Sequence, residues 1–189
     1  MGSKRTAVET KRLIFEGCSR ILQREGLSSL TLDAVAEEAQ LSKGGLLYHF
    51  PNKVALIEGL FEYHNNIFEA RLQELTAVEG DAPGAWLRAY ALASIEQITD
   101  HENASLYASL LAAEEKYASA HQLMRQKYIK WQAQIEQSDI DPVWATFLRL
   151  AVDGLWTSIK NQYAPPDEER LEAIKDLILK LTKQSQPVS

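Results

Sequence analysis

Several features that would assign this chain to a specialised class of protein are scarce or absent. Cys18 is the only cysteine, which excludes an intramolecular disulfide framework, and its place in an amphipathic helical pattern predicts a small buried hydrophobic residue rather than a redox sensor. The longest stretch without a charged residue, 103–113, is about half of the roughly 20 residues that a membrane-spanning helix needs. The N-terminus lacks the apolar region of a signal peptide. We therefore expect a soluble, cytoplasmic protein.

The sequence motifs of common enzymes and metal sites are also missing. There is no Walker-type phosphate loop, no His-Glu-x-x-His motif and no Gly-x-Ser-x-Gly motif. None of the four histidines has a glutamate three residues before it, as a di-iron helical bundle requires. Paired carboxylates such as Glu114 and Glu115 fit solvated helix faces. We expect no catalytic residues, no metal and no cofactor.

Charge is distributed unevenly along the 189 residues, whose composition is globular. The formal net charge is −6, yet the first 64 residues hold eight basic and eight acidic side chains, so the excess negative charge lies downstream. Residues 1–24 hold six basic and two acidic side chains. A polyanion would be repelled by most of the chain and tolerated near the N-terminal end, which permits DNA binding without establishing it.

The apolar periodicity predicts an all-α fold of about nine helices, because no segment shows sustained two-residue alternation. The capping box Thr6–Glu9 begins the first helix and Gly26 ends it, while Thr31, Ser42, Asn52 and Asp141 have the character of N-caps. The stretch 77–84, AVEGDAPG, is the one plausible boundary. The later helices are expected at 31–39, 43–49, 53–76, 84–99, 103–115, 117–137, 142–163 and 167–182.

The stretch LSKGGLLYHFPNK, 41–53, contains two adjacent glycines within a short predicted helix. The helices 31–39 and 43–49 are joined by three residues, the length of a helix-turn-helix. Leu46 and Phe50 share one face, and Gly44 and Tyr48 lie about 200° around the helix from Leu46. A glycine on the outward face packs against nothing, so its use is to let the backbone approach something large, such as a major groove.

Two lysines, Lys43 and Lys53, occupy the first turns of consecutive helices, where a cation opposes the helix dipole. A phosphate that joined each helix N-terminus with its lysine would explain both placements. The alternative is two solvated surface lysines.

The stretch TLDAVAEEAQLSKGGLLYHFPNK, 31–53, resembles the helix-turn-helix of TetR-family transcriptional repressors, and the match extends over roughly residues 8–60. The rest of the chain resembles the family only in the number and order of its helices. The resemblance implies a DNA-binding domain, 1–52, followed by a ligand-binding and dimerisation domain, 53–189, with helix 53–76 connecting them. It further implies a homodimer that binds a palindromic double-stranded DNA operator and is released by a small-molecule effector.

Carried over position by position, the resemblance assigns DNA contacts to the starts of three helices and to the outward face of the recognition helix. These residues are Thr31, Ser42, Lys43, Gly44, Gly45, Leu47, Tyr48, His49 and Lys53. Three positions depart from the usual family pattern. Gln40 replaces the turn glycine, so the backbone there should differ slightly or be slightly strained, and Gly45 and Leu47 remove polar contacts. We therefore expect DNA shape and backbone contacts to supply much of the specificity. Lys4 and Arg5 either reach the minor groove or are solvated.

The segment 143–159 is apolar on nearly every face, which suggests one face in the domain core and another in a subunit interface. Together with the last amphipathic helix it predicts a four-helix dimer interface. The alternative is a central core helix in a monomer. The predicted interface residues are Trp144, Leu148, Ala151, Leu155, Leu171, Ile174 and Ile178.

An aromatic-rich set in the C-terminal two-thirds is typical of a small-molecule site, although aromatic residues at helical spacing are also typical of an ordinary core. The candidate ligand contacts are Trp86, Tyr90, Tyr107, Tyr117, His121, Trp131, Phe147 and Trp156. The sequence thus favours a DNA-binding regulator, a repressor released by an apolar or amphipathic effector. The alternative is a helical small-molecule or protein-binding module that does not engage DNA.

Overall fold

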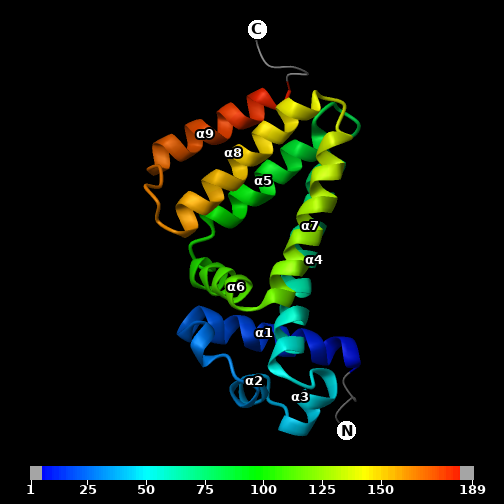
Figure 1. Ribbon diagram of the computed structural model, residues 1–189, viewed down its shortest axis with the longest axis vertical. Helices are drawn as coiled ribbons and strands as arrows, with labels where there is room; N and C mark the ends of the chain where they lie inside the picture. Colours follow the sequence, from blue (N-terminus) through cyan, green and yellow to red (C-terminus); the bar gives the residue numbers. More distant parts are fainter. Residues whose placement is uncertain (1–5, 184–189) are drawn as a thin grey trace. The chain divides into compact units, whose positions relative to one another are not determined.

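The computed structural model describes residues 6–183, and this range is helical without any strand (Figure 1). The predicted all-α class is confirmed, and so is the number of helices for the described part of the chain. The elements are α1 (Ala7–Glu25), the 3-10 turn η1 (Leu27–Ser29), α2 (Leu32–Glu38), α3 (Lys43–His49), α4 (Lys53–Glu79), α5 (Ala85–Thr99), α6 (Ala104–Lys116), α7 (Ala118–Glu136), α8 (Pro142–Lys160) and α9 (Glu168–Leu181). Lys4 and Arg5 lie outside the described residues.

Local capping chemistry sets most helix starts where the sequence predicts them. Thr6 and Glu9 form the complete capping box of α1, and Asn52 Oδ1 accepts a hydrogen bond from the backbone N–H of Ala55 at 2.9 Å. The predicted end of the fourth helix at about residue 76 is wrong. The helix continues to Glu79 because residues 77–79 contain no breaker, and it ends at Gly80, whose φ is +62°. The helix predicted to reach Tyr163 ends at Lys160.

The described helices fall into two compact units. The first contains the described residues up to Asn65 together with Glu102–Met124, and the second contains Asn66–His101 and the described residues from Arg125 onward. Both α4 and α7 therefore contribute residues to each unit. No helix of the described part is long and apolar enough to cross a membrane. The predicted functional division between residues 52 and 53 stays a prediction.

In the first unit, α1 packs against α2 and α6 around one continuous hydrophobic core. Cys18 belongs to this core and is fully buried, and burial raises the pKa of its thiol to about 12. A thiol with such a pKa is protonated and unreactive at neutral pH. The prediction of a small buried hydrophobic residue at this position is confirmed.

The short helix α3 is held in place by Leu46 on its inward face and by Phe50, the residue that follows it. Leu46 is completely buried, and the ring of Phe50 lies 5.3 Å from the ring of Phe15 between centroids. Gly59 of α4 makes room for these rings, since a Cβ atom there would stand 2.8 Å from the Phe50 ring. The inward face that the sequence predicts for α3 is therefore confirmed.

The turn between α2 and α3 has a left-handed residue at Gln40, whose φ is +55°. Its backbone N–H donates to the carbonyl of Glu37 at 3.0 Å, and the N–H of Leu41 donates to the carbonyl of Ala36 at 2.8 Å. The turn thus keeps a glycine-type conformation without a glycine. A residue with a Cβ atom is strained in this region by about 1–2 kcal/mol. The sequence predicts that the backbone at Gln40 either differs slightly from that of the usual turn or is slightly strained. The structure shows the strained backbone.

In the second unit, α5 packs against α8 and α9. Arg88 of α5 connects the ends of three helices through hydrogen bonds. This residue is only 3% exposed. Its Nε donates to Glu79 Oε2 at 2.8 Å, and its Nη1 donates to the carbonyls of Pro83 at 2.8 Å and Thr182 at 3.1 Å. Gly84 is needed beside it, because its φ is +73° and a Cβ atom there would lie 2.4 Å from the carbonyl oxygen of Thr182.

His64 of α4 is partly buried in the first unit, where its Nε2 lies 3.0 Å from the hydroxyl of Ser19 on α1. Burial lowers the pKa of the imidazole from 6.5 to about 4. The native state therefore holds this histidine neutral at pH values where the unfolded chain has already bound a proton. The stability that it contributes is complete above the unfolded pKa and is lost as the pH falls towards the folded pKa.

We expect His64→Gln to make unfolding less sensitive to acid. Between about pH 7 and pH 5, the wild type should lose about 2 kcal/mol more unfolding free energy than the variant, because glutamine keeps a polar partner for Ser19 but cannot bind a proton. Urea unfolding at both pH values measures this difference. The carboxylates titrate equally in the two proteins, so an identical loss in both would contradict a buried neutral His64.

We expect Gln40→Gly to raise the unfolding free energy by about 0.5–1 kcal/mol. Glycine relieves the left-handed strain, and this gain exceeds the extra entropy that glycine gives to the unfolded chain. Thermal and urea unfolding check the change. Gln40→Ala is the matched control and should leave stability near that of the wild type, because alanine retains the Cβ atom; a glycine variant no more stable than this control would refute the strain.

Candidate nucleic-acid interface and ligand site

The outward face of α3 is free of contacts with the rest of the protein. Gly44 is exposed, and a Cβ atom built on it would meet no heavy atom within 4 Å. Tyr48, one turn further along, has 84% of its surface exposed. The outward orientation predicted for both residues is confirmed. Gly44 has no packing neighbour and most of the Tyr48 side chain is exposed, so the face can be approached closely by a large partner.

Lys43 forms an exposed ion pair with Asp33 of α2, with Nζ 2.8 Å from Oδ1. An ion pair between exposed side chains contributes no more than about 1 kcal/mol and is screened by salt. A phosphate oxygen could replace the carboxylate at little cost. Lys53, the first residue of α4, is half-buried.

The hydroxyl groups of Thr31 and Ser42 cap α2 and α3. Each accepts one hydrogen bond at 3.1 Å, from the backbone N–H of Ala34 and Gly45 respectively. A capping hydroxyl still has its own hydrogen to donate, so each cap can also bind an anion.

The remaining predicted DNA contacts are half-buried. A Cβ atom on Gly45 would lie 3.2 Å from the hydroxyl oxygen of Ser42, so the absence of a side chain at this position also serves the cap. His49 sets its ring edge-on to Tyr48, with centroids 5.1 Å apart. Leu47 has an intermediate exposure.

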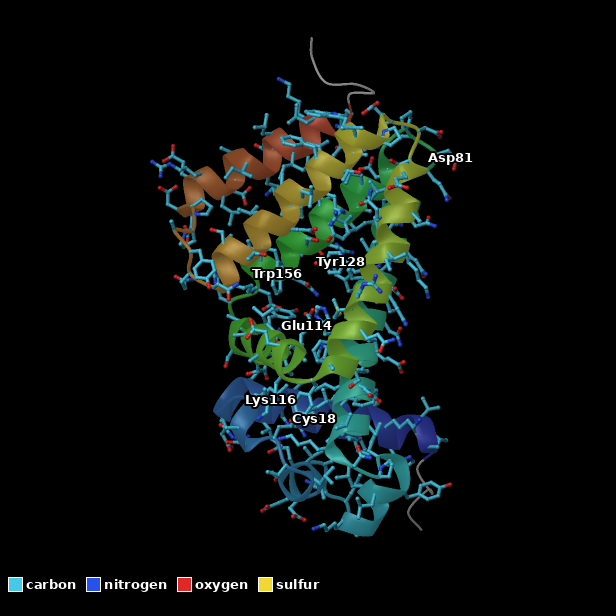
Figure 2. The ribbon with its side chains drawn as sticks, in the orientation of Figure 1. Cys18, Asp81, Glu114, Lys116, Tyr128 and Trp156 are labelled. Atoms are coloured by element: carbon cyan, nitrogen blue, oxygen red, sulfur yellow. The ribbon has the colours of Figure 1, made fainter. Side chains whose placement is uncertain are left out.

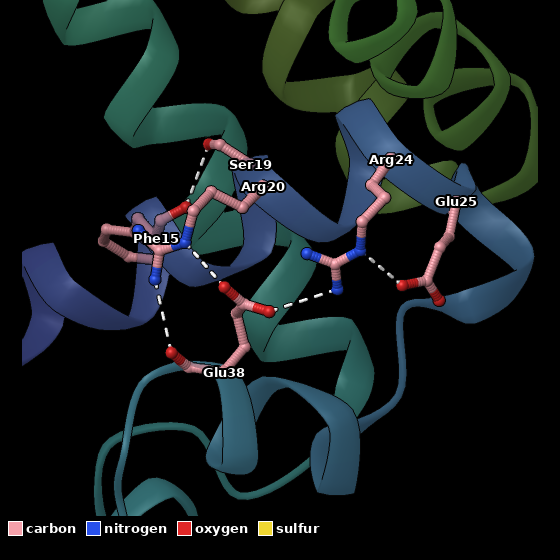
Figure 3. A network of polar contacts seen from close by, with 6 residues as sticks. All are labelled: Phe15, Ser19, Arg20, Arg24, Glu25 and Glu38. Atoms are coloured by element: carbon pink, nitrogen blue, oxygen red, sulfur yellow. Dashed lines mark hydrogen bonds and ion pairs between the residues drawn. The ribbon is translucent and has the colours of Figure 1, made fainter.

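An ion-pair network that sequence analysis missed fastens α1 to the end of α2 (Figure 3). Arg20 Nε donates to Glu38 Oε1 at 2.6 Å, and Arg24 Nη2 donates to Glu38 Oε2 at 3.1 Å. These hydrogen bonds, with that from Arg20 the stronger influence, lower the pKa of the Glu38 carboxyl. Two of the basic residues near the N-terminus therefore have a structural partner. No local sequence signal links them to Glu38, because the partners lie far apart along the chain.

Three of the eight predicted ligand contacts come together in the second unit. Tyr90 lies between Trp86 and Trp131, with ring centroids 5.7 and 5.9 Å away. Phe68 and Tyr128, which the sequence analysis did not select, complete this aromatic cluster at 5.2 and 5.1 Å from the Trp131 ring. Tyr128 precedes Trp131 by one helical turn, so helical spacing could have identified Tyr128 from the sequence. Figure 2 labels Tyr128 on α7. No comparable pattern points to Phe68 of α4.

Tyr90 of the aromatic cluster forms a polar pair with the half-buried Asp153. The hydroxyl of Tyr90 donates to Asp153 Oδ1 at 2.5 Å, and Asp153 also accepts from Arg149. Burial raises the pKa of Tyr90 well above its usual value and also raises the pKa of Asp153. The tyrosine hydroxyl is therefore protonated and its proton already has an acceptor, which leaves the hydroxyl unavailable as a hydrogen-bond donor to a ligand.

The other five predicted ligand contacts lie elsewhere. Phe147 stacks on Trp144 at 5.5 Å, and Trp156 packs against the cluster of Ile95, Ile98 and Leu155. Tyr107, Tyr117 and His121 belong to the first unit. Tyr117 packs on that unit's core, and His121 is exposed beside Glu114, with Nδ1 3.4 Å from Oε1.

The predicted dimer residues divide between core and surface. Leu148, Leu155 and Ile178 are buried within the second unit, so they have little area left for a partner subunit. Leu171 and Ile174 pack partly against the same unit, and Trp144 is half-buried, whereas Ala151 is exposed. The large apolar side chains exposed on these two helices are Val143, Phe147, Leu150 and Leu177.

Within the described residues, no group of three or more histidine, cysteine, aspartate or glutamate side chains is arranged to hold a metal ion.

Comparison with known proteins identifies related chains. Residues 14–60 match the profile of bacterial regulatory proteins of the tetR family, and residues 84–183 match that of the tetracyclin repressor-like C-terminal domain. The transcriptional regulator TtgR of Pseudomonas putida is 33% identical over 76 residues, which are 38% of this chain and 36% of TtgR. AcrR of Shigella flexneri is 27% identical over 110 residues, 58% of this chain and 51% of AcrR. These matches thus span between about a third and a half of the relatives' lengths.

Solved structures share the fold. A TetR-family regulator from Rhodococcus sp. superposes with a TM-score of 0.72 at 20% identity, over 93% of this chain and all of that one. The multidrug binding protein EbrR, complexed with ethidium, has a TM-score of 0.70 at 21% identity, over 95% of this chain and 100% of its own. The family is one of transcriptional regulators and not of enzymes. Because the two profiles together cover most of its length, this chain belongs to the TetR family of transcriptional regulators.

Proposed function

We propose that this protein is a DNA-binding transcriptional repressor that binds a palindromic operator as a homodimer and is released by a small apolar or amphipathic effector. The observation that carries the proposal is the outward face of α3, where Gly44 has no neighbour and Tyr48 is exposed beside two lysine-bearing helix starts. Backbone N–H groups at helix N-termini, capping hydroxyls and lysines are the groups that bind DNA phosphates.

The proposed DNA contacts divide by position. Lys43, Lys53, Thr31 and Ser42 stand at the starts of α2, α3 and α4 and would bind phosphates. Gly44, Gly45, Leu47, Tyr48 and His49 lie along α3 and would face the groove or its edges. Few of these side chains can read bases, so the sequence preference would come largely from DNA shape.

A second copy of the chain is the partner that best fits the exposed apolar face of α8. Val143, Phe147 and Leu150 are 79%, 56% and 54% exposed and lie three or four residues apart, with Gly154 open at the end of the same row. Burying such a row against its symmetry mate removes apolar surface from water in both subunits. Leu177 supplies an exposed apolar side chain on α9. Ala151, Trp144, Leu171 and Ile174 would border this interface.

The aromatic cluster of the second unit is the proposed effector site. Aromatic walls with few polar groups are typical of small-molecule pockets. The solved structure of EbrR, a multidrug binding protein complexed with ethidium, supports an aromatic effector for this chain.

The proposed function is tested by selecting bound fragments from the source genome with the wild type and with Lys43→Ala/Lys53→Ala. We expect the wild type to enrich a palindromic site and the double variant to lose most of that enrichment. On the selected site, the slope of log affinity against log salt should fall in magnitude by about four units, because the homodimer loses two phosphate contacts in each subunit.

Lys180→Ala/Lys183→Ala is the charge-matched control, because it removes two exposed lysines from the end of the second unit. It should retain the site and the salt slope. Equal enrichment by the wild type and the Lys43/Lys53 variant, with both folded, would refute the repressor and favour a helical binding module that does not engage DNA.

The variant Gly44→Ala tests whether the glycine is needed for close approach to DNA or for the stability of the protein. Alanine should stabilise α3 by about 0.5–1 kcal/mol, because the new methyl group meets nothing in the protein. If α3 enters a major groove, the same methyl group should lower operator affinity at least about tenfold, as a clash at a tight interface does. Urea unfolding and fluorescence anisotropy of labelled operator measure the two effects. A more stable variant with unchanged affinity would show that Gly44 does not approach the DNA.

A further inference from the structure

Residues 6–65, the N-terminal part of the first unit, neutralise most of their own positive charge. They contain six basic side chains, and four of these form ion pairs within the same segment. The pairs are Arg12 with Glu16, Arg20 with Glu38, Arg24 with Glu25 and Glu38, and Lys43 with Asp33. The other two basic residues, Lys11 and Lys53, form no ion pair with a described residue. A polyanion that approaches this segment therefore meets lysines and arginines that already have acidic partners.

The pair between Lys43 and Asp33 is the one that lies among the proposed DNA contacts. Lys43 is the first residue of α3, and Asp33 stands in the first turn of α2, two residues after the cap Thr31. The sequence contains no acidic residue between Glu38 and Glu58, a stretch that includes α3 and the start of α4. Asp33 thus places a negative charge beside groups that are proposed to bind phosphates.

The carboxylate of Asp33 binds the Lys43 ammonium in the way that a phosphate would. The Nζ atom lies 2.8 Å from Oδ1 and 3.1 Å from Oδ2, so both carboxylate oxygens contact the same ammonium. A phosphodiester group likewise offers two oxygens that share one negative charge and accept hydrogen bonds from lysine. The two side chains are 59% and 72% exposed, so a phosphate can reach the ammonium and replace the carboxylate.

Two effects make Asp33 unfavourable for phosphate binding. The existing ion pair must be broken, and the released carboxylate then stays close to the phosphate, where two like charges repel each other. Asp33 could also favour binding by ordering the Lys43 side chain in advance. This contribution is the smaller one, because an exposed ion pair holds a lysine side chain only weakly.

We propose that Asp33 limits the affinity of the protein for the DNA backbone by occupying the place of a phosphate on Lys43. Non-specific binding consists almost entirely of phosphate contacts, so the pair weakens attachment to DNA of any sequence. Retention at the correct site then depends more strongly on the contacts of α3 in the groove. The proposal rests on the proposed function in one respect, the phosphate contact of Lys43.

A double-mutant cycle separates competition for Lys43 from general repulsion between Asp33 and DNA. The full-length protein is titrated into a labelled random-sequence DNA duplex at about 50 mM salt, and binding is followed by fluorescence anisotropy. We expect Asp33→Asn to tighten binding about five- to twentyfold, since the loss of an exposed competing pair is worth up to about fivefold in each subunit of the proposed homodimer. In a Lys43→Met background the same change should tighten binding no more than about twofold, because only screened repulsion is then removed.

Two matched controls accompany the cycle. Glu37→Gln removes a negative charge from the same face of α2, one turn beyond Asp33, and Glu37 is exposed and forms no ion pair with a described residue. Its effect should be small and equal with and without Lys43. Lys53→Met removes a proposed phosphate contact that has no acidic partner, so the full effect of Asp33→Asn should persist in that background. Urea unfolding confirms that each variant is folded.

Two results would overturn the proposal. Equal tightening by Asp33→Asn in the wild-type and Lys43→Met backgrounds would show general repulsion without competition. Weaker binding by Asp33→Asn would show that the carboxylate instead positions Lys43 for the phosphate.

Failure of the proposed function gives a different pattern. If the wild type and Asp33→Asn both bind the duplex no better than Lys43→Ala/Lys53→Ala, the face around α3 does not engage DNA and both proposals are refuted. If Lys53→Met weakens binding while Asp33 and Lys43 show no coupling, the face engages DNA and only the role of Asp33 is refuted.

Discussion

Burial of Leu46 and Phe50 is the constraint on which the proposed interface depends. A helix of seven residues with two glycines has no appreciable stability of its own in water, because nucleation is costly and each glycine weakens it further. The helix α3 exists because these two side chains enter the core of the first unit, where Gly59 leaves room for the rings of Phe50 and Phe15. Burial of these two side chains is thus the main source of the stability of α3, to which the Ser42 cap adds, and the outward face has no packing role.

Because the inward side of α3 provides its stability, the rest of this segment can contain residues that are unfavourable for folding. The backbone at Gln40 is strained, Gly44 weakens its helix, and Lys43 opposes the dipole of α3. Asp33 compensates the lysine in the free protein through an ion pair that is easily exchanged. Backbone strain and locally unfavourable residues cluster where proteins meet their ligands, and a packed core provides the stability to tolerate them.

Local chemistry was predictable from the sequence, whereas long-range pairing was not. Helix starts follow from caps within three residues, so those at Thr6, Thr31 and Ser42 are where the sequence indicates. The contacts of Glu38 with Arg20 and Arg24 and of Arg88 with Thr182 join residues far apart along the chain, and no local pattern encodes them. Aromatic content likewise selected Trp86, Tyr90 and Trp131, which come together in one cluster, but could not separate them from Tyr107 and Tyr117, which fold into the other unit.

The burial of Cys18 has a practical consequence. Its thiol is inaccessible and remains protonated at neutral pH, so maleimide or methanethiosulfonate reagents will not modify it in the folded chain. Since this is the only cysteine, a thiol introduced at an exposed position such as Tyr48 would be the single reactive group. Spin labels or fluorophores can therefore be attached to α3 in an otherwise native sequence, without first replacing a residue of the core that holds this helix.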